Sequence, residues 1–138
     1  MLVLEDFVKV FWSVAIGAAL GGLSRYYLAS FIQQRAGPDF PVGTLIVNIT
    51  GSFLLGVIVR FALQSDIIST EARTLLTTGF CGGYTTFSTF SYETALMIED
   101  REYGRAALYV AASVAISLLG VFLGFAVANR LLALRGAG

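Results

Sequence analysis

Two sets of uncharged polar residues recur at helical spacing inside apolar stretches of the sequence. The first set is Thr44, Asn48 and Ser52, and the second is Tyr109, Ser113 and Ser117. Residues four apart share one face of a helix, so each set predicts a polar stripe. Hydroxyl and amide groups donate hydrogen bonds without carrying a formal charge. One stripe alone fits hydrogen bonding between helices equally well, but two together favour a polar path for an anion.

A segment rich in threonine and glycine adds a second kind of chemistry. The 19 uncharged residues 74–92 contain six threonines, three glycines and two serines, which makes them a poor lipid-facing helix. The adjacent Gly82 and Gly83 each cost a helix about 1 kcal/mol relative to alanine, so we expect the helix to break there. Backbone groups freed at mid-membrane are tolerated only where they line a cavity or coordinate an ion. Free carbonyls are hard ligands that suit a cation such as Na⁺.

Two phenylalanines follow the expected break. Phe87 and Phe90 are three residues apart on one helical face, beside Ser88 and Thr89. The edge of a phenylalanine ring is the positive end of its quadrupole and can face a small anion. By itself such a pair indicates only core packing. Next to a broken, threonine-rich segment it favours an anion site.

Two charged residues near these features have alternative interpretations. Arg25 either attracts anions at the mouth of the path, or snorkels to the interface or pairs with an acid there. Glu93 closes the uncharged segment and either ends the polar path or caps the helix at the membrane interface. A carboxylate that faced an anion path would have to be protonated, turned away or paired.

Composition excludes several functional classes. The 138 residues are 57% hydrophobic, with nine basic and nine acidic residues and no net charge. A nucleic-acid partner is not expected, because phosphate binding requires a basic excess. With no histidine and a single cysteine, Cys81, the chain lacks the parts for a transition-metal site or a histidine-based catalytic pair. We therefore do not expect an enzyme.

The spacing of the charges predicts the elements that must position these residues. A helix needs about 20 mostly apolar residues to cross a bilayer. Four stretches qualify, at approximately 8–32, 41–62, 73–97 and 104–130. We therefore expect an all-α, multi-pass membrane protein in which residues 1–138 form a single domain of four transmembrane helices, the third broken at its centre.

Glycines supply contact points between these helices, because close backbone approach stabilises helix pairs in lipid. They form three pairs: Gly17 and Gly21, Gly51 and Gly56, and Gly120 and Gly124. We interpret all six as packing positions.

The basic residues are divided almost evenly between the two predicted sides of the membrane. Five belong to the side of the termini and four, counting Arg25, to the opposite side. A basic excess on one side normally fixes orientation. We infer that the chain inserts both ways and that opposite copies pair as an antiparallel dimer. Two helix breaks that met on the dimer axis would double the carbonyl ligands around one cation.

Three motifs resemble a known family. Residues 82–91, Gly-Gly-Tyr-Thr-Thr-Phe-Ser-Thr-Phe-Ser, closely resemble the signature of the CrcB family, the Fluc fluoride channels. Residues 21–26, Gly-Gly-Leu-Ser-Arg-Tyr, and 43–48, Gly-Thr-Leu-Ile-Val-Asn, are similar to its first- and second-helix motifs. The resemblance covers essentially the whole chain. It implies a dual-topology, antiparallel homodimer with two fluoride pores and a structural Na⁺ at the dimer interface.

The resemblance also implies roles for individual residues. Backbone carbonyls of Gly82 and Thr85 would hold Na⁺, and Phe87 and Phe90 would form an aromatic box beside the fluoride path. The other positions implied for the path are Asn48, Ser88, Thr89, Tyr109, Ser113 and Ser117, with Arg25 near the vestibule. We include Thr44 from the first stripe and Glu93 from the end of the third span among the candidate pore residues.

The expected function is passive fluoride efflux across the bacterial inner membrane, which lowers cytoplasmic fluoride. The alternative is a small multidrug-type, proton-coupled exporter of dual topology. Such an exporter needs an ionisable carboxylate deep in a span, whereas Glu93 lies near the end of one. A third interpretation is a membrane assembly subunit without transport activity. Such a subunit would not need so polar a span.

Overall fold

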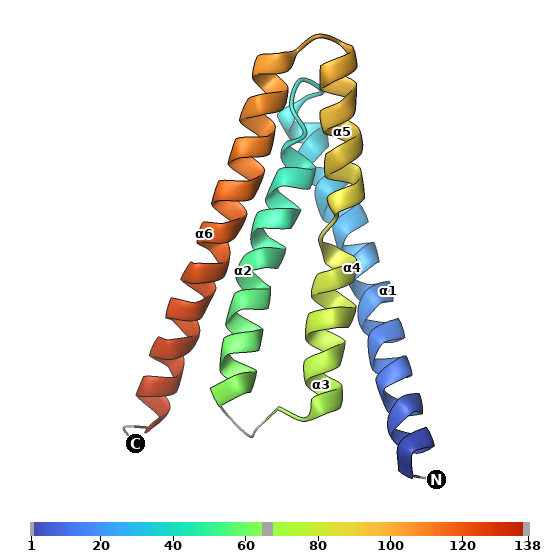
Figure 1. The fold of residues 1–138 in the computed structure, drawn as a ribbon, viewed down its shortest axis with the longest axis vertical. Coiled ribbons are helices and arrows are strands. Elements are labelled where there is room, and N and C mark those ends of the chain that lie inside the picture. Colours follow the sequence, from blue (N-terminus) through green and yellow to red (C-terminus); the bar gives the residue numbers. More distant parts are fainter. Residues whose placement is uncertain (1, 65–67, 137–138) are drawn as a thin grey trace.

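Helices account for every regular element that the computed structural model describes, in residues 2–64 and 68–136. The three long helices are α1 (Leu2–Ala36), α2 (Val42–Gln64) and α6 (Tyr103–Gly136). Between α2 and α6 lie α3 (Thr70–Thr74), the π-helix η1 (Leu75–Cys81), α4 (Gly82–Tyr84) and α5 (Phe87–Glu99). Both termini lie at one end of the molecule, and the α5–α6 connection lies at the other (Figure 1).

Three helices are long and apolar enough to cross a membrane, over Leu4–Ala36, Val42–Gln64 and Tyr103–Arg135. At 1.5 Å per residue, α1 is about 50 Å long, which exceeds the roughly 30 Å of a hydrocarbon core. Large apolar side chains cover the outside of these helices, as at Phe7, Leu119 and Phe122. That surface suits lipid rather than water. The predicted connection around 64–72 includes residues 65–67, which lie outside the described ranges.

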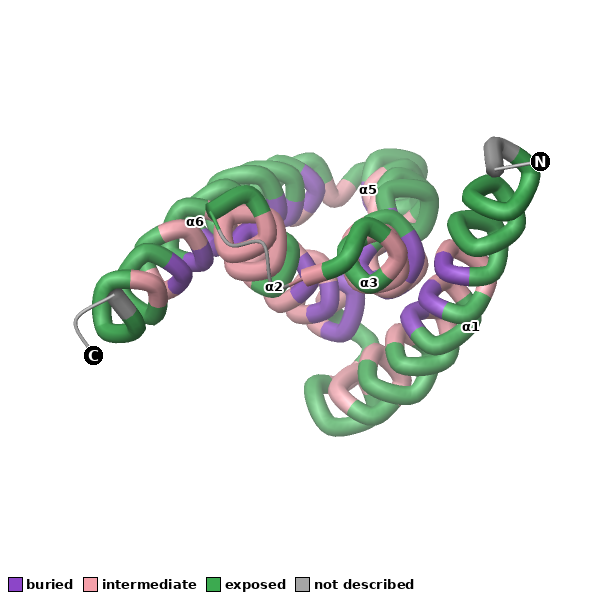
Figure 2. Tube along the Cα trace, turned by 90° about the horizontal axis from the view of Figure 1, so that it is seen from below, coloured by how far each residue is buried: buried purple, intermediate pink, exposed green. Residues whose placement is uncertain are grey.

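The helices pack as two pairs. α2 lies along α6, while η1 and α4 lie along α1, and α1 also contacts α2. Among the described elements α6 has no close contact with η1 or α4, so the two pairs are separated on that side. Buried positions follow the inner faces of α1, α2 and α6 (Figure 2). This arrangement leaves room for a cavity between the pairs.

Glycines allow the helices within each pair to approach closely. A Cβ atom on Gly83 would lie 2.6 Å from the carbonyl oxygen of Ala18 on α1. One on Gly124 of α6 would lie 2.8 Å from the backbone nitrogen of Val57 on α2. No side chain fits at either position. Neighbouring backbone would also obstruct a Cβ at Gly17, which confirms its interpretation as a packing position.

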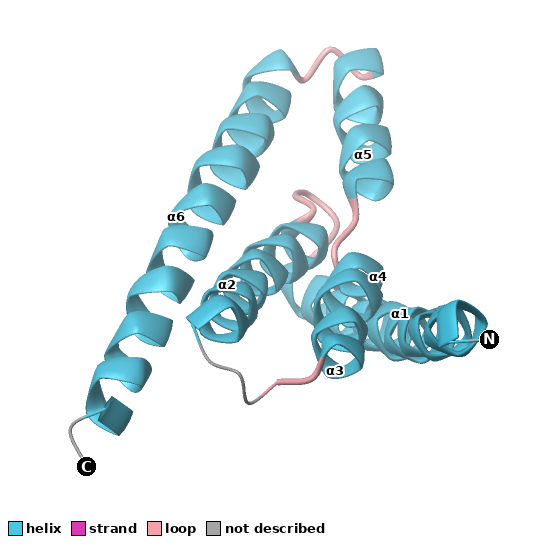
Figure 3. Cartoon of the chain, turned by 60° about the horizontal axis from the view of Figure 1, so that its bottom comes forward, coloured by secondary structure: helices cyan, strands magenta, loops and turns pink. Residues whose placement is uncertain are grey.

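The third predicted span, 73–97, is interrupted near its centre as predicted, but not at the two glycines expected to break it. Gly82 has helical backbone angles, φ −64° and ψ −37°, and Gly83 belongs to the same short helix α4. The interruption lies at Thr85 and Thr86, whose extended angles separate α4 from α5. Figure 3 shows this link as a loop between two helical pieces. Gly83 packs against Ala18 of α1 and Gly82 continues the helix, so the prediction that these glycines break it was wrong.

The turn after α5 contains a strained residue. Arg101 has a φ of 61°, in the left-handed region that glycine adopts more easily. It ends α5 in a Schellman arrangement, in which Glu102 N–H donates to the Met97 carbonyl and Arg101 N–H donates to the Ile98 carbonyl. The turn therefore satisfies the last carbonyls of the helix at some conformational cost.

We predict that Arg101→Gly stabilises the protein by about 1 kcal/mol, because glycine removes the Cβ clash of the left-handed conformation. The midpoint of thermal unfolding in detergent measures this gain. Arg101→Ala is the matched control, since it removes the charge and keeps the Cβ atom. An equal gain in both variants would show that the charge, and not the backbone angle, limits stability.

Candidate functional site

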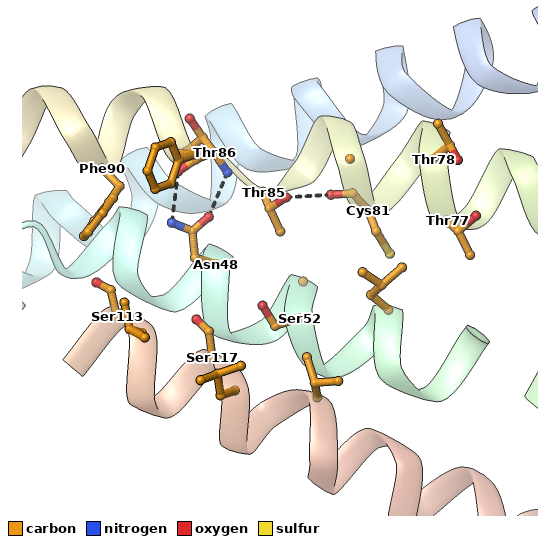
Figure 4. A pocket seen from close by; sticks show the side chains of 17 residues that line it. Asn48, Ser52, Thr77, Thr78, Cys81, Thr85, Thr86, Phe90, Ser113 and Ser117 are labelled. Carbon is orange, nitrogen blue, oxygen red and sulfur yellow. Dashed lines mark hydrogen bonds between the residues drawn. The ribbon is translucent and has the colours of Figure 1, made fainter. Parts of the chain in front are cut away.

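A cavity of about 610 Å³ opens between the two helix pairs. Its walls come from α2, η1, α4, α5 and α6 and from the link between α4 and α5 (Figure 4). None of the described residues that line it is charged. Its polar side chains are hydroxyls, a thiol and one amide, from Asn48, Ser52, Thr77, Thr78, Cys81, Thr85, Thr86, Ser113 and Ser117. The cavity is therefore polar on part of its wall and electrically neutral.

Asn48 holds the helix break from α2. Its Nδ2 group donates to the Thr86 carbonyl at 3.1 Å, and its Oδ1 accepts from the Thr86 N–H at 2.8 Å (Figure 4). One side chain thus satisfies both backbone polar groups of a residue that has left the helix. In a continuous helix the Thr86 N–H would donate to the Gly82 carbonyl, four residues earlier. Here it donates to Asn48 instead, so the Gly82 carbonyl loses that partner. The amide retains a second N–H for another acceptor.

Two further contacts fix the break. The Nη1 group of Arg25, on α1, donates to the Thr85 carbonyl at 3.1 Å. The Thr86 hydroxyl accepts from Thr89 N–H at 3.2 Å and so caps the start of α5. Among the described residues, the Arg25 guanidinium bonds to a backbone carbonyl and forms no ion pair with an acid. Whether Arg25 also attracts anions stays a prediction.

Two hydroxyls of the second stripe, those of Ser113 and Ser117, face the cavity from α6 (Figure 4). Ser113 is 7% exposed, and its Oγ is the one buried side-chain polar atom of the described residues without a hydrogen-bond partner. Buried polar atoms are nearly always paired, so an unpaired one in a cavity indicates a missing ligand or water. Ser117 lines the same cavity one turn further along α6.

Two aromatic rings border this polar wall. Phe87 and Phe90 both line the cavity, with ring centroids 5.6 Å apart and a tilt of 45° between the rings. Phe87 is 79% exposed at the start of α5, although it is a large apolar residue. Ser88 and Thr89 are exposed beside it and do not line the cavity in the single chain. The structure therefore brings together part of the predicted set.

Three other predicted residues form a hydrogen-bonded group beyond Phe90. Tyr109 is completely buried, and its hydroxyl donates to Glu93 Oε2 at 2.6 Å. The Thr44 hydroxyl donates to Glu93 Oε1 at 2.7 Å. Phe90 connects this group to the cavity, because its ring lies 5.1 Å from that of Tyr109. Glu93 is thus paired with donors, as a carboxylate beside an anion path requires.

The break also carries the backbone oxygens considered for a cation. Gly82 is exposed on the cavity side, and its carbonyl lacks the Thr86 N–H. The Thr85 carbonyl already accepts from Arg25, but a carbonyl oxygen has a second lone pair. Both are carbonyl oxygens, the type of ligand that a hard cation prefers. Two oxygens are too few to replace a hydration shell, so a second copy would have to supply the rest.

Sequence reasoning missed several residues of the site. Thr86 is buried and is the partner of Asn48, while Cys81 and Thr77 line the cavity. A signal for Thr86 exists in the sequence, because threonine is a favoured residue before the first turn of a helix. We find no comparable signal for Cys81, which is buried at the end of η1, the π-helix that packs against α1.

Comparison of the sequence with known proteins identifies its family. The family described as "CrcB-like protein, Camphor Resistance (CrcB)" matches residues 12–125. A relative from Geobacter sulfurreducens, named fluoride-specific ion channel FluC, is 48% identical over 86% of this chain and 96% of its own length. Relatives of the same name from Thermococcus gammatolerans and Acidobacterium capsulatum are 46% and 43% identical, over 88% and 91% of this chain and 98% and 100% of their own. The chain belongs to the CrcB family.

Proposed function

We propose that the chain is a fluoride-selective channel that lets fluoride leave the cell down its gradient across the inner (plasma) membrane. The observation that carries this proposal is the unpaired Ser113 hydroxyl, buried in a neutral cavity beside Phe90. The name shared by the relatives supports fluoride as the ion. No described residue that lines the cavity could bind an anion through a formal positive charge.

Neutral donors suit passage better than a fixed cation does. An anion that leaves water must be met by other donors, and conduction requires that each contact be weak enough to release it. Ser113 and Ser117 offer hydroxyls one helical turn apart, and Asn48, whose amide keeps a second N–H, lines the same space. The rings of Phe87 and Phe90 add positive edges without adding charge. Together these groups form several weak sites in sequence.

We further propose that two copies assemble as an antiparallel homodimer in which the broken third spans meet. The start of α5 exposes Ser88, Thr89 and Ser91 together with Phe87, and α5 contacts only α6 and α2 in the single chain. Hydroxyls turned toward lipid are unfavourable, so a protein surface must cover them. A second copy supplies that surface and completes the neutral path on both sides.

The proposed dimer holds a structural Na⁺ between the two breaks. The Gly82 and Thr85 carbonyls of each copy supply its ligands, and the ion offsets the clustering of backbone oxygens on the axis. Arg25 keeps the Thr85 carbonyl in place through its hydrogen bond. We assign the ion no part in the movement of fluoride.

Purified protein in liposomes tests the proposed function. We expect trapped fluoride to leave down its gradient at a rate far above that of chloride, as a fluoride electrode and a chloride electrode report. The expectation rests on short-range donors and ring edges, which favour a small anion over a larger one. Equal rates for the two ions, or fluoride movement strictly tied to protons, would contradict the channel and favour the exporter.

Substitution of the rings tests the aromatic contribution. We predict that Phe87→Ile or Phe90→Ile lowers fluoride flux roughly two- to tenfold, since an aliphatic side chain removes a polarised edge worth about 0.5–1.5 kcal/mol. The electrode assay measures flux, and gel filtration confirms that assembly is retained. Phe122→Ile, on the exposed face of α6, is the matched control and should keep wild-type flux. Wild-type flux in the first two variants would remove the aromatic role.

A label on the C-terminus tests the proposed assembly. We expect a membrane-impermeant reagent to reach that label from both sides of the membrane, because neither orientation is favoured by the basic residues. The purified dimer should also unfold at a higher temperature in Na⁺ than in a salt of a bulky organic cation, because a bound ion stabilises the folded state. Labelling from one side only would exclude the antiparallel dimer, and equal melting temperatures would exclude the structural ion.

A further inference from the structure

A second cavity, of about 380 Å³, borders the group formed by Thr44, Glu93 and Tyr109. Glu93 lines this second cavity, whereas Phe90 lines the first. Tyr109 lines neither and is completely buried, yet it contacts both residues. The buried ring and hydroxyl of Tyr109 therefore connect Phe90, on the first cavity, with Glu93, on the second, and we call them the partition.

Two phenylalanine rings pack against the Tyr109 ring. Phe90 lies against it on the side of the first cavity, with ring centroids 5.1 Å apart. Phe40 also meets the ring edge-on, at 5.4 Å and an interplanar angle of 82°. This T-shaped geometry places the positive edge of one ring on the negative face of the other. Four rings thus follow one another from the first cavity outward: Phe87, Phe90, Tyr109 and Phe40.

The connection between α1 and α2 fixes the place of Phe40. Pro38 and Pro41 flank it and restrict the backbone on both sides. Gln33, near the end of α1, donates from Nε2 to the carbonyls of Gly37 and Phe40, the latter at 3.0 Å. Its Oε1 accepts from Gly43 N–H at 3.0 Å, in the first turn of α2. A single side chain therefore ties this connection to both helices.

We propose that Phe40 is a positioning residue for ion passage, which holds the Tyr109 ring so that the Tyr109 hydroxyl stays on Glu93. The inference rests on the proposed channel function and extends it to a residue outside both polar stripes. Phe40 acts through Tyr109 and does not touch the ion. Without Phe40, the Tyr109 ring can move more freely, and the hydrogen bond from its hydroxyl to Glu93 loses its fixed geometry.

Flux through Phe40→Ala tests the inference. We expect fluoride flux to fall roughly two- to tenfold, the value of one edge-on aromatic contact. Phe40→Tyr, which keeps the ring, should restore wild-type flux, and Phe122→Ala on the outer face of α6 should not change it. If Phe40→Ala does not assemble, Phe40→Leu takes its place, since leucine fills most of the volume without a ring. Wild-type flux in the variant that lacks the ring would overturn the inference.

A double-mutant cycle separates positioning from general damage to the fold. Tyr109→Phe keeps the ring of residue 109 and removes its hydroxyl. If Phe40 acts through that hydroxyl, Phe40→Ala should change flux less than about twofold in the Tyr109→Phe background. If the flux of the double variant instead falls by the product of the two single losses, Phe40 is only structural and the proposal is overturned.

A second readout does not depend on transport. A fluorinated tyrosine at position 109 reports the surroundings of the ring by fluorine NMR. We expect its resonance to shift and broaden in Phe40→Ala and to stay unchanged in Phe122→Ala. Failure of wild-type protein to pass fluoride would refute the proposed function, while an unchanged resonance in Phe40→Ala would refute the positioning role itself.

Discussion

The pair of hydrogen bonds between Asn48 and the backbone of Thr86 is the interaction on which the rest of the structure depends. In an apolar environment each backbone polar group left unpaired costs several kcal/mol, so a helix cannot simply stop inside a membrane. Asn48 satisfies the N–H and the carbonyl of Thr86 together. Arg25 satisfies the neighbouring Thr85 carbonyl from another helix. The break is therefore a defined element held by α1 and α2, and it frees the Gly82 carbonyl at a fixed position.

A neutral cavity follows from that arrangement. Arg25 is the charged residue nearest the break, and its guanidinium is committed to a carbonyl oxygen. The polar wall is consequently built from groups such as the Ser113 hydroxyl and the Asn48 amide. These groups stabilise an anion by short, directional hydrogen bonds, whose strength depends steeply on distance. Neutrality and close contact together explain how such a wall can favour a small anion without holding it tightly.

Charge spacing and residue periodicity predicted the helices and much of the site, because both are local properties of the sequence. Thr44 and Asn48 do share one face of α2, and Ser113 and Ser117 share one face of α6. The position of the break could not be predicted from these local properties. It depends on Asn48, which is 38 residues away from Thr86. At Gly83, glycine's weak helix propensity, a cost of about 1 kcal/mol, is outweighed by close packing against Ala18 of α1.

Helix α2 relates the two cavities to each other. Thr44 and Asn48 lie one turn apart on it, about 6 Å along the axis. The first binds Glu93 at the partition, and the second binds Thr86 at the break. Because a helix transmits displacement along its length, neither contact can shift alone without distorting the turn between them. Gln33 anchors the start of the same helix through Gly43 N–H. The partition and the break are therefore held in register by one rigid element, and the α1–α2 connection sets where that element begins.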